Sequence, residues 1–587
     1  MKQKAQSAVD AFSRYAASLR TTSPVFLAIA AIVTALAAGL TFRRATTPWA
    51  SMPDADYWGN IHGLITEAGV RLDPGALLHH NNEHIVPIPK LIYLANYLVT
   101  SGSNTGLIVY SLLAGAACTA LLLLLARETL IDTPWRFLLC AVLFPLVMFS
   151  AKLTHSYFLG MSGTIWLTAD LFVIASAASL ARAIATGRSG WLLLSLATAL
   201  IGILTYSTAV YALLVLLIYC VAKLSRPKLP GPDSWLLLLG TAGMIVLVLG
   251  LGLAYRNQPS HHPTLAFDPL GLVRFVLIYL GNALTTGPLR VVVGIVILVA
   301  GGFAIRALAA QGRVREMLLW IVLFLFAPFN ALMTGIGRLG NGVKMAAASR
   351  YQTVTAISLI AAITLILAAL PRDAVSRRAT IWRSAVFAAL LVCAAVIALN
   401  RSHVDNFAAR NERKALAEIA LRQGIESDRH LEASTPAKGQ LERVLPALRA
   451  VRHAPFHWQS RCEDMLGRRL AASDLPAAGS LEALSVYERS HGAGPAIELS
   501  GWAEDEGAGA ECIVIVDGSG IAIGSGVSVK RRPDIDRAKG RSLGRVGWKA
   551  VAVLPQTTPV CALALFPGEP QLVPISRCET PGSAAPP

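Results

Sequence analysis

The sequence predicts a polytopic α-helical membrane protein with a C-terminal extracytoplasmic α+β region, and three observations lead to this fold class. Hydrophobic residues make up 54% of the 587 residues and charged residues only 15%, a composition typical of integral membrane proteins. Apolar runs of about 20 residues, long enough to cross a bilayer, recur through roughly the first 400 positions. From Arg401 onward charges are frequent and no such run appears.

About eleven membrane-spanning helices are expected in the first region. Their expected ranges are 24–42, 104–126, 135–152, 160–181, 191–206, 207–222, 234–254, 290–309, 317–336, 352–370 and 384–399. Residues 191–222 are expected to form a hairpin of two short spans, because the sequence "TYST" at Thr205–Thr208 interrupts the apolar run. The segment 86–99 and part of 255–289 are apolar but interrupted by proline, lysine or glycine, so we expect helices along the membrane surface.

Basic residues between the spans predict the orientation of the chain. Lys and Arg concentrate in alternate short loops, which the positive-inside rule places in the cytoplasm together with residues 1–23. We therefore expect 45–103, 255–289, 337–351 and everything after about residue 400 outside the cytoplasm. This distribution also explains the net charge of +17 without nucleic-acid binding.

The soluble part is expected to contain a helical region and a β domain. The predicted division is a cytoplasmic segment 1–23, a transmembrane domain 24–400, a helical linker region 401–480, a β-sandwich 481–582 and a disordered tail 583–587. Alternating apolar residues and the "DGSG" turn at Asp517–Gly520 indicate β-hairpins. Four cysteines in this region, Cys462, Cys512, Cys561 and Cys578, predict two disulfides, with three connectivities open.

Two carboxylates follow the first span in "PDADYW", Pro53–Trp58. A positioned carboxylate is an effective general base, and Asp54 and Asp56 cannot easily share one helical face, so a loop or helix start is expected. Either carboxylate could serve in this way or bind a divalent cation, Mg²⁺ or Mn²⁺. Tyr57 and Trp58 either contact substrate or form an interfacial aromatic belt. A purely structural role for both aspartates is the alternative.

Three further sets of polar residues are candidates for binding. In "HHNNEH", His79–His84, we expect His80, Asn82, Glu83 and His84 to contact phosphate or sugar hydroxyls, while metal binding and loop hydrogen bonding are the alternatives. Before the tenth span, Arg338, Lys344, Arg350 and Tyr351 suit a lipid phosphate, unless they anchor the outer leaflet. Asp170, near the middle of the fourth span, either faces a substrate cavity or is a packed, protonated residue.

Together these motifs resemble the GT-C class of integral membrane glycosyltransferases. The resemblance covers about residues 20–400 and is carried by Asp54-Ala55-Asp56-Tyr57-Trp58, by the histidine segment, which has a doubled asparagine where the family shows "H-N-E-H", and by Gly337-Arg338 with Ala347–Tyr351. It implies a GT-C-like fold with a large first extracytoplasmic loop, 45–103, a polyprenyl-phosphate sugar donor and a place in a bacterial inner membrane. By position in the family motif it implies Asp54 as the general base, with Asp56 orienting the acceptor or binding a divalent cation. The acceptor would be a cell-envelope glycan or glycolipid, and the β-sandwich would be carbohydrate-binding-like.

Two other functions remain open from the sequence. A flippase or transporter of lipid-linked sugars would also need many spans, although no internal repeat of the kind common in transporters is evident. A non-catalytic envelope glycan-binding or assembly protein would use the β-sandwich as its functional part.

Overall fold

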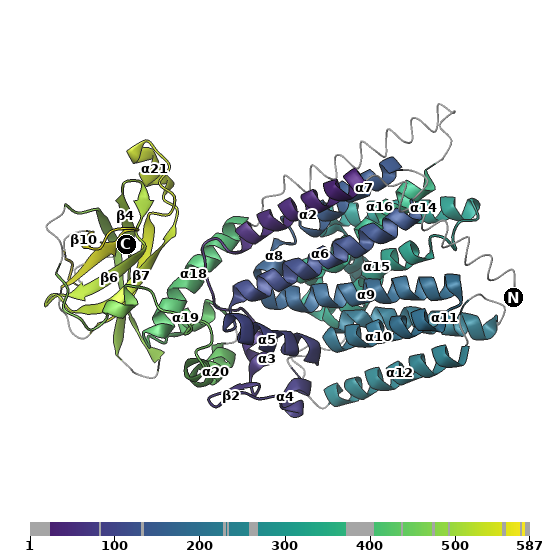
Figure 1. Ribbon diagram of the computed structural model, residues 1–587, viewed down its shortest axis with the longest axis horizontal. Helices are drawn as coiled ribbons and strands as arrows, with labels where there is room; N and C mark the ends of the chain where they lie inside the picture. The colour runs from purple at the N-terminus through teal and green to yellow at the C-terminus, as the bar shows by residue number, and fades with distance from the viewer. Residues whose placement is uncertain are drawn as a thin grey trace. The chain divides into compact units, whose positions relative to one another are not determined.

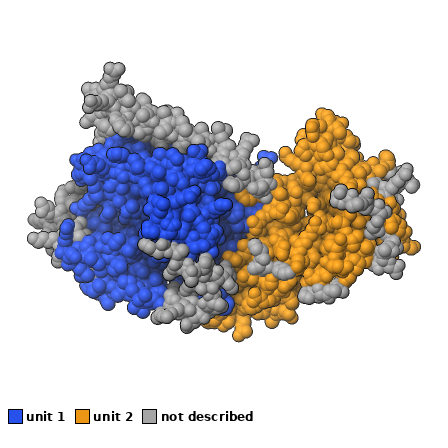
Figure 2. All heavy atoms as spheres, turned by 180° about the vertical axis from the view of Figure 1, so that it is seen from behind, with its two compact units in different colours: residues 1–45, 77–92, 107–404 blue, residues 46–76, 93–106, 405–587 orange. Residues whose placement is uncertain are grey.

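The computed structural model describes residues 24–80, 84–130, 134–226, 231, 234–256, 268–370, 404–435, 438–471, 476–490, 494–554, 559–575 and 578–580. These residues form two compact units, coloured separately in Figure 2. Unit 1 comprises residues 1–45, 77–92 and 107–404, and unit 2 comprises 46–76, 93–106 and 405–587. Part of the loop after the first span therefore belongs to the same compact unit as the C-terminal region.

Unit 1 is a helical bundle. Its long helices are α2 (Pro24–Ala45), α6 (Asn104–Thr129), α7 (Pro134–Met148), α9 (Gly160–Thr186), α10 (Ser189–Thr205), α11 (Val210–Ser225), α12 (Ser234–Arg256), α14 (Leu289–Ala310), α15 (Leu318–Arg338) and α16 (Gln352–Ala369). Several of them, including α6, α9, α10 and α12, lie roughly alongside one another in Figure 1. Each corresponds to one predicted span, while the eleventh, 384–399, lies outside the described residues.

Seven described helices are long and apolar enough to cross a membrane, and four shorter apolar helices accompany them. The break predicted at "TYST" is confirmed, because α10 ends at Thr205 and a 3-10 turn at Ser207–Ala209 precedes α11. Buried side chains of α9, α10, α11 and α12 then share one hydrophobic cluster. The chain is thus a multi-pass α-helical membrane protein.

The two segments expected along the membrane surface are helices shorter than the spans. They are α5 (Pro87–Thr100) and α13 (Pro269–Gly281). Helix α13 begins with Asp268 as its N-cap, whose side chain accepts a hydrogen bond from the Gly271 amide at 2.9 Å. Helix α14 packs closely on α13, because Gly281 and Gly294 have no side chain to separate the two backbones. A Cβ atom at either position would collide with the backbone of the other helix.

Unit 2 begins with the loop that follows α2. It contains the short helix α3 (Tyr57–Ile61), the hairpin β1 (Ile65–Thr66) and β2 (Gly69–Val70), and part of α4 (Pro74–Leu78). Its C-terminal helices are α18 (Val404–Arg422), α19 (Asp428–Glu432) and α20 (Lys438–Ala450). We call residues 46–76 the first loop.

The β domain forms one antiparallel sheet of eight strands, not the two separate sheets of the sandwich that the alternating pattern predicts. The strands are β3 (Gly479–Glu488), β4 (Pro495–Asp505), β5 (Ala508–Gly509), β6 (Cys512–Asp517), β7 (Ala522–Lys530), β8 (Gly547–Val553), β9 (Val560–Leu565) and β10 (Leu572–Pro574), with α21 (Pro533–Lys539) between β7 and β8. Their order is β10-β9-β6-β7-β8-β4-β3, and β5 pairs with β4.

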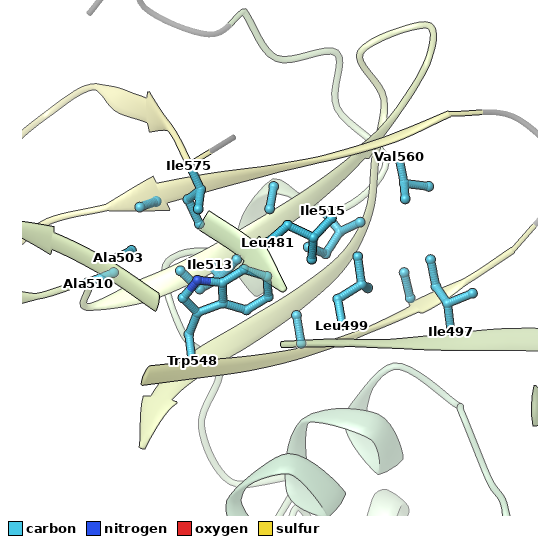
Figure 3. Close-up of a cluster of buried hydrophobic side chains, with 14 of the residues drawn as sticks. Leu481, Ile497, Leu499, Ala503, Ala510, Ile513, Ile515, Trp548, Val560 and Ile575 are labelled. Atoms are coloured by element: carbon cyan, nitrogen blue, oxygen red, sulfur yellow. The ribbon is translucent and has the colours of Figure 1, made fainter. Parts of the chain in front are cut away.

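The sheet curls around its own hydrophobic face. Inward residues of β3, β4, β6, β8 and β9 form one cluster, with Trp548 at its centre (Figure 3). A strongly twisted sheet can supply both facing layers of a core by curling, which is why strand alternation alone does not distinguish it from a sandwich. Trp548 is a core residue.

Two disulfides hold this region, as the four cysteines predicted. Cys462 pairs with Cys512, and Cys561 pairs with Cys578. The first joins the segment before the sheet to β6, and the second fastens the last described residues to β9. Cys118, Cys140 and Cys220 are buried in unit 1 as free thiols.

Candidate functional site

Asp54 of the "PDADYW" motif is fully buried in unit 2 between two cations. Its Oδ2 accepts from Lys414 Nζ at 2.7 Å, and its Oδ1 accepts from Arg410 at 3.1 Å. The side chains of Asp54 and Lys414 are both 0% exposed, and both cations come from α18. Because both carboxylate oxygens already accept from cations and the side chain is fully buried, Asp54 offers no surface for a substrate to reach.

Tyr57 and Trp58 are buried within unit 2 and are not an interfacial aromatic belt. Trp58 Nε1 donates to Ser434 Oγ at 2.8 Å, and the Tyr57 hydroxyl lies 3.0 Å from His453 Nε2. His453 Nδ1 lies 2.8 Å from the Ala454 carbonyl, to which only a protonated Nδ1 can donate. Burial lowers the pKa of His453 to about 4, so the ring is neutral at pH 7 and its Nε2 accepts from Tyr57.

Neighbouring backbone in the first loop is held by a second buried acid of α18. Glu418 accepts from the Ser51 hydroxyl at 3.0 Å and from the Met52 amide at 2.6 Å. The Ala55 amide, at a residue with φ of +54°, donates to the Ser434 carbonyl at 3.0 Å. These contacts fix the conformation of residues 51–58 from both sides.

Asp56 differs from Asp54 because it is only half-buried, at the N-cap position of α3. Its carbonyl accepts from the Asn60 amide at 3.1 Å. The rigid segment around it holds this carboxylate at a defined place at the edge of unit 2. Of the two predicted carboxylates, Asp56 is therefore the one that a substrate can approach.

A divalent cation does not fit at Asp54, because both carboxylate oxygens already accept from cations. Within the described part of the chain, no three His, Cys, Asp or Glu side chains are grouped as metal ligands. We therefore route no step through a metal.

The histidine segment belongs to unit 1. His84 is half-buried; its ring packs on Tyr206 at 4.4 Å between centroids, and its Nε2 lies 3.1 Å from the Tyr206 hydroxyl. His80 is half-buried, and burial lowers its pKa. Lys90 Nζ donates to the His79 carbonyl at 2.6 Å and so braces the segment. The predicted residues Asn82 and Glu83 lie outside the described residues.

Tyr206 continues into a row of aromatic rings that includes the predicted residue Tyr351. Ring centroids are 4.7 Å apart for Tyr206 and Trp166, 5.7 Å for Trp166 and Tyr351, and 4.9 Å for Tyr351 and Tyr279. The Arg350 guanidinium lies over the Tyr351 ring at 5.2 Å. The structure thus places His84, Arg350 and Tyr351, far apart in the sequence, along one row.

The segment before α16 is folded into three consecutive 3-10 turns, Leu339–Asn341, Val343–Ala347 and Ser349–Tyr351. Asn282 donates to the Ala348 carbonyl at 3.2 Å, and Ser349 Oγ lies 2.7 Å from His155 Nδ1. Lys344 is exposed, whereas Arg338 ends α15 and is half-buried. Of the predicted residues in this segment, Arg350 and Tyr351 have a ring contact in the aromatic row.

Asp170 and several other buried polar groups in unit 1 lack ordinary partners. In the part of the chain that the structure describes, no hydrogen bond is made by either Asp170 carboxyl oxygen, by the Tyr279 and Tyr351 hydroxyls, by Gln352 Oε1 or by Thr353 Oγ1. The Thr353 hydroxyl is a near neighbour of the Asp170 carboxyl, but the two do not meet the geometry of a hydrogen bond. Buried polar groups are normally satisfied, so unsatisfied ones beside an aromatic row indicate a binding region for a polar group.

Two cations meet on the carbonyl of Thr285. Lys152, in the loop between α7 and α8 (Thr154–Phe158), donates through Nζ to this oxygen, and Arg290 Nε donates to it at 3.3 Å. Among the described residues no carboxylate forms an ion pair with either cation. Burial, and secondly the charge of Arg290, lowers the pKa of Lys152 to about 8. A buried lysine and a half-buried arginine that donate to the same carbonyl form a candidate site for an anion such as phosphate.

These cations were not among the strongest sequence candidates. Lys152 stands at the end of an apolar run and Arg290 at the start of another, where basic residues are ordinary flanking residues. Neither segment alone indicates that the two residues converge. The signal that the sequence offered is that both residues are basic and lie on the side predicted to be extracytoplasmic, where the positive-inside rule makes basic residues unusual.

The fold and these clusters define a multi-pass helical membrane protein with a disulfide-containing β domain. Among solved structures it is similar to the crystal structure of ArnT from Cupriavidus metallidurans bound to undecaprenyl phosphate. That likeness covers 73% of this chain and 77% of the ArnT chain, at 17% identity and a TM-score of 0.34. No protein-family model and no curated protein matches the chain.

Proposed function

We propose that the protein is a GT-C-type membrane glycosyltransferase that moves a sugar from a polyprenyl-phosphate donor to a cell-envelope glycan or glycolipid. The observation that carries this proposal is the pair of the buried Lys152 and the half-buried Arg290, in a helical bundle whose described residues also include unsatisfied buried polar groups. Intramembrane polar groups of this kind mark the paths of polar substrates. The sequence resemblance and the bound undecaprenyl phosphate of the ArnT structure support the same donor class.

In this reaction a carboxylate removes the proton of the acceptor hydroxyl, whose oxygen bonds to the anomeric carbon of the sugar. The bond between that carbon and the phosphate oxygen breaks, and polyprenyl phosphate leaves with the electron pair. We propose Asp56 as the base, because Asp54 is sequestered by Lys414 and Arg410. Asp54 then acts as a positioning residue for the loop. Lys152 and Arg290 bind the phosphate, while Arg350 and Tyr351 remain proposed donor contacts.

The transfer is proposed to occur on the extracytoplasmic face of the inner membrane. The positive-inside pattern supports this orientation, and so do the two disulfides of unit 2, which form and persist in oxidising compartments. His80, Asn82, Glu83 and His84 remain proposed substrate contacts, as does Asp170.

Asp56→Asn is expected to lower sugar transfer by about 10²–10⁴-fold, because a positioned general base contributes about that factor. The activity is first identified by mass analysis of envelope glycans from a deletion strain, which should lack one sugar residue. Initial rates are then compared in membranes that contain equal amounts of each variant. Glu67→Gln is the matched control, since Glu67 is an exposed acid of the same loop. A wild-type rate for Asp56→Asn would remove Asp56 as the base.

The same deletion strain separates the alternative functions. Asp170, buried within a span, is the observation that favours a transporter, because intramembrane acids also serve as proton relays. A lipid-linked sugar that accumulates on the cytoplasmic side would indicate a flippase. Unchanged glycans would indicate a binding or assembly protein, and a missing sugar residue without accumulation on that side indicates the transferase.

The pH dependence of donor binding tests the phosphate site independently. Lys152 has a pKa of about 8, so its charge is present below pH 8 and is lost as the pH rises above it. Binding of undecaprenyl phosphate, measured in nanodiscs, is expected to weaken between pH 7 and 9. Lys152→Arg should bind with little change over this range, because arginine stays protonated. The assignment of Lys152 would be overturned if both proteins had the same pH profile.

A further inference from the structure

A large apolar groove lies on unit 1, and its described lining residues include no member of the aromatic row or of the Lys152–Arg290 pair. It has a volume of about 980 Å³ and is lined by α9, α11 and α15. Several lining side chains are substantially exposed, among them Ile218, Leu325 and Leu332. The groove is therefore open along the outer surface of the helices.

One end of the groove carries a single cation. Arg315, in the loop between α14 and α15, lines the groove and is exposed. In the described part of the chain it makes no ion pair, although Arg313 pairs with Glu316 in the same loop at 3.1 Å. This end of the bundle is also where α9 and α11 finish, next to Arg188 and Arg226, and the topology predicts it to be cytoplasmic.

We propose that this groove binds one anionic glycerophospholipid of the cytoplasmic leaflet, with its phosphate at Arg315 and its acyl chains along α15. The lining residues of α15 run from Leu318 to Leu332, about 21 Å at 1.5 Å per residue. A leaflet contributes about half of the 30 Å hydrocarbon core, or about 15 Å, so a groove of this length passes the bilayer centre by about 6 Å. The groove is thus long enough for the acyl chains of a lipid in one leaflet.

The volume agrees with two acyl chains. A methylene group occupies about as much space as a water molecule, roughly 30 Å³, so 980 Å³ holds about thirty of them. Bilayer lipid tails are as apolar as the lining, so burial of the tails supplies little preference for any one lipid. The preference must come from the head group, and Arg315 favours a negative one. The groove shares no described lining residue with the proposed donor site, so the lipid proposal does not depend on the proposed function.

Native mass spectrometry of the full chain, released from nanodiscs, tests this proposal with phosphatidylglycerol and phosphatidylcholine as probes. The wild type is expected to retain one phosphatidylglycerol in preference to phosphatidylcholine. Arg315→Gln should lower the apparent affinity for phosphatidylglycerol about fivefold, the effect of one basic residue near a charged membrane surface. Arg306→Gln is the matched control, because Arg306 is an exposed arginine of α14 outside the groove.

A second variant keeps the test independent of Arg315. Leu325→Trp fills part of the groove and is expected to reduce retention of the lipid while it leaves the head-group charge in place. Equal retention of both lipids by the wild type would overturn the proposal, and so would unchanged binding in both variants. Displacement of phosphatidylglycerol by equimolar undecaprenyl phosphate would also overturn it, because the groove would then serve the polyprenyl chain.

Discussion

Replacing Asp54 by Leu is expected to destabilise the full chain by about 3–5 kcal/mol, because it removes the carboxylate that accepts from the fully buried Lys414 and so breaks a buried ion pair. The apparent midpoint of thermal unfolding in detergent measures the effect. Arg410 is less affected, since its side chain is 28% exposed and keeps contact with water. Asp56→Asn serves as the control in the same motif, and it is expected to leave the midpoint nearly unchanged.

The double variant Asp54→Leu with Lys414→Met distinguishes a positioning role of Asp54 from a catalytic one. Replacing both members of a buried ion pair by apolar residues is often close to neutral, so most of the lost stability should return. If sugar transfer returns with it, Asp54 acts only through the loop that it holds. A stable double variant without transfer would instead assign chemistry to Asp54, as the sequence prediction had it.

Trp58→Ala is expected to cost a further large amount of stability, about 3–5 kcal/mol, because the indole is fully buried and its removal leaves a cavity. The change also leaves Ser434 without the donor that lies 2.8 Å from its hydroxyl oxygen. Limited proteolysis of the full chain, followed at sites in the first loop and in α18–α20, should show faster cleavage.

Trp49→Ala is the matched control for this variant. Trp49 lies in the same loop, but its side chain is 51% exposed, so its loss should change stability by less than about 1 kcal/mol. Equal proteolytic resistance of Trp58→Ala and the wild type would contradict the role of Trp58 as an anchor between the first loop and the C-terminal helices.

The histidine segment and the 3-10 turns before α16 show how much of the candidate site could be predicted from local sequence patterns. The residue types at His84, Arg350 and Tyr351 predict contact with polar substrate groups, and the structure does bring these three into one aromatic row. The same reasoning places Lys344 among them, although its side chain is exposed. Residue type indicates which chemistry is available, but proximity depends on how the turns before α16 fold.

The sequence by itself determined the multi-pass helical class, the ranges of the ten described helices of unit 1, the break between α10 and α11 and the presence of two disulfides. These features depend on local properties, namely the length of apolar runs, a polar interruption, and cysteine number in a soluble region. Only the tertiary structure decided the partners of Asp54, which come from Arg410 and Lys414, more than 350 residues later. It also decided that Lys152 and Arg290 converge on one carbonyl and that the strands of the β domain form one sheet. The physical reason is that a contact between residues far apart in the chain leaves no periodic pattern in the sequence around either residue.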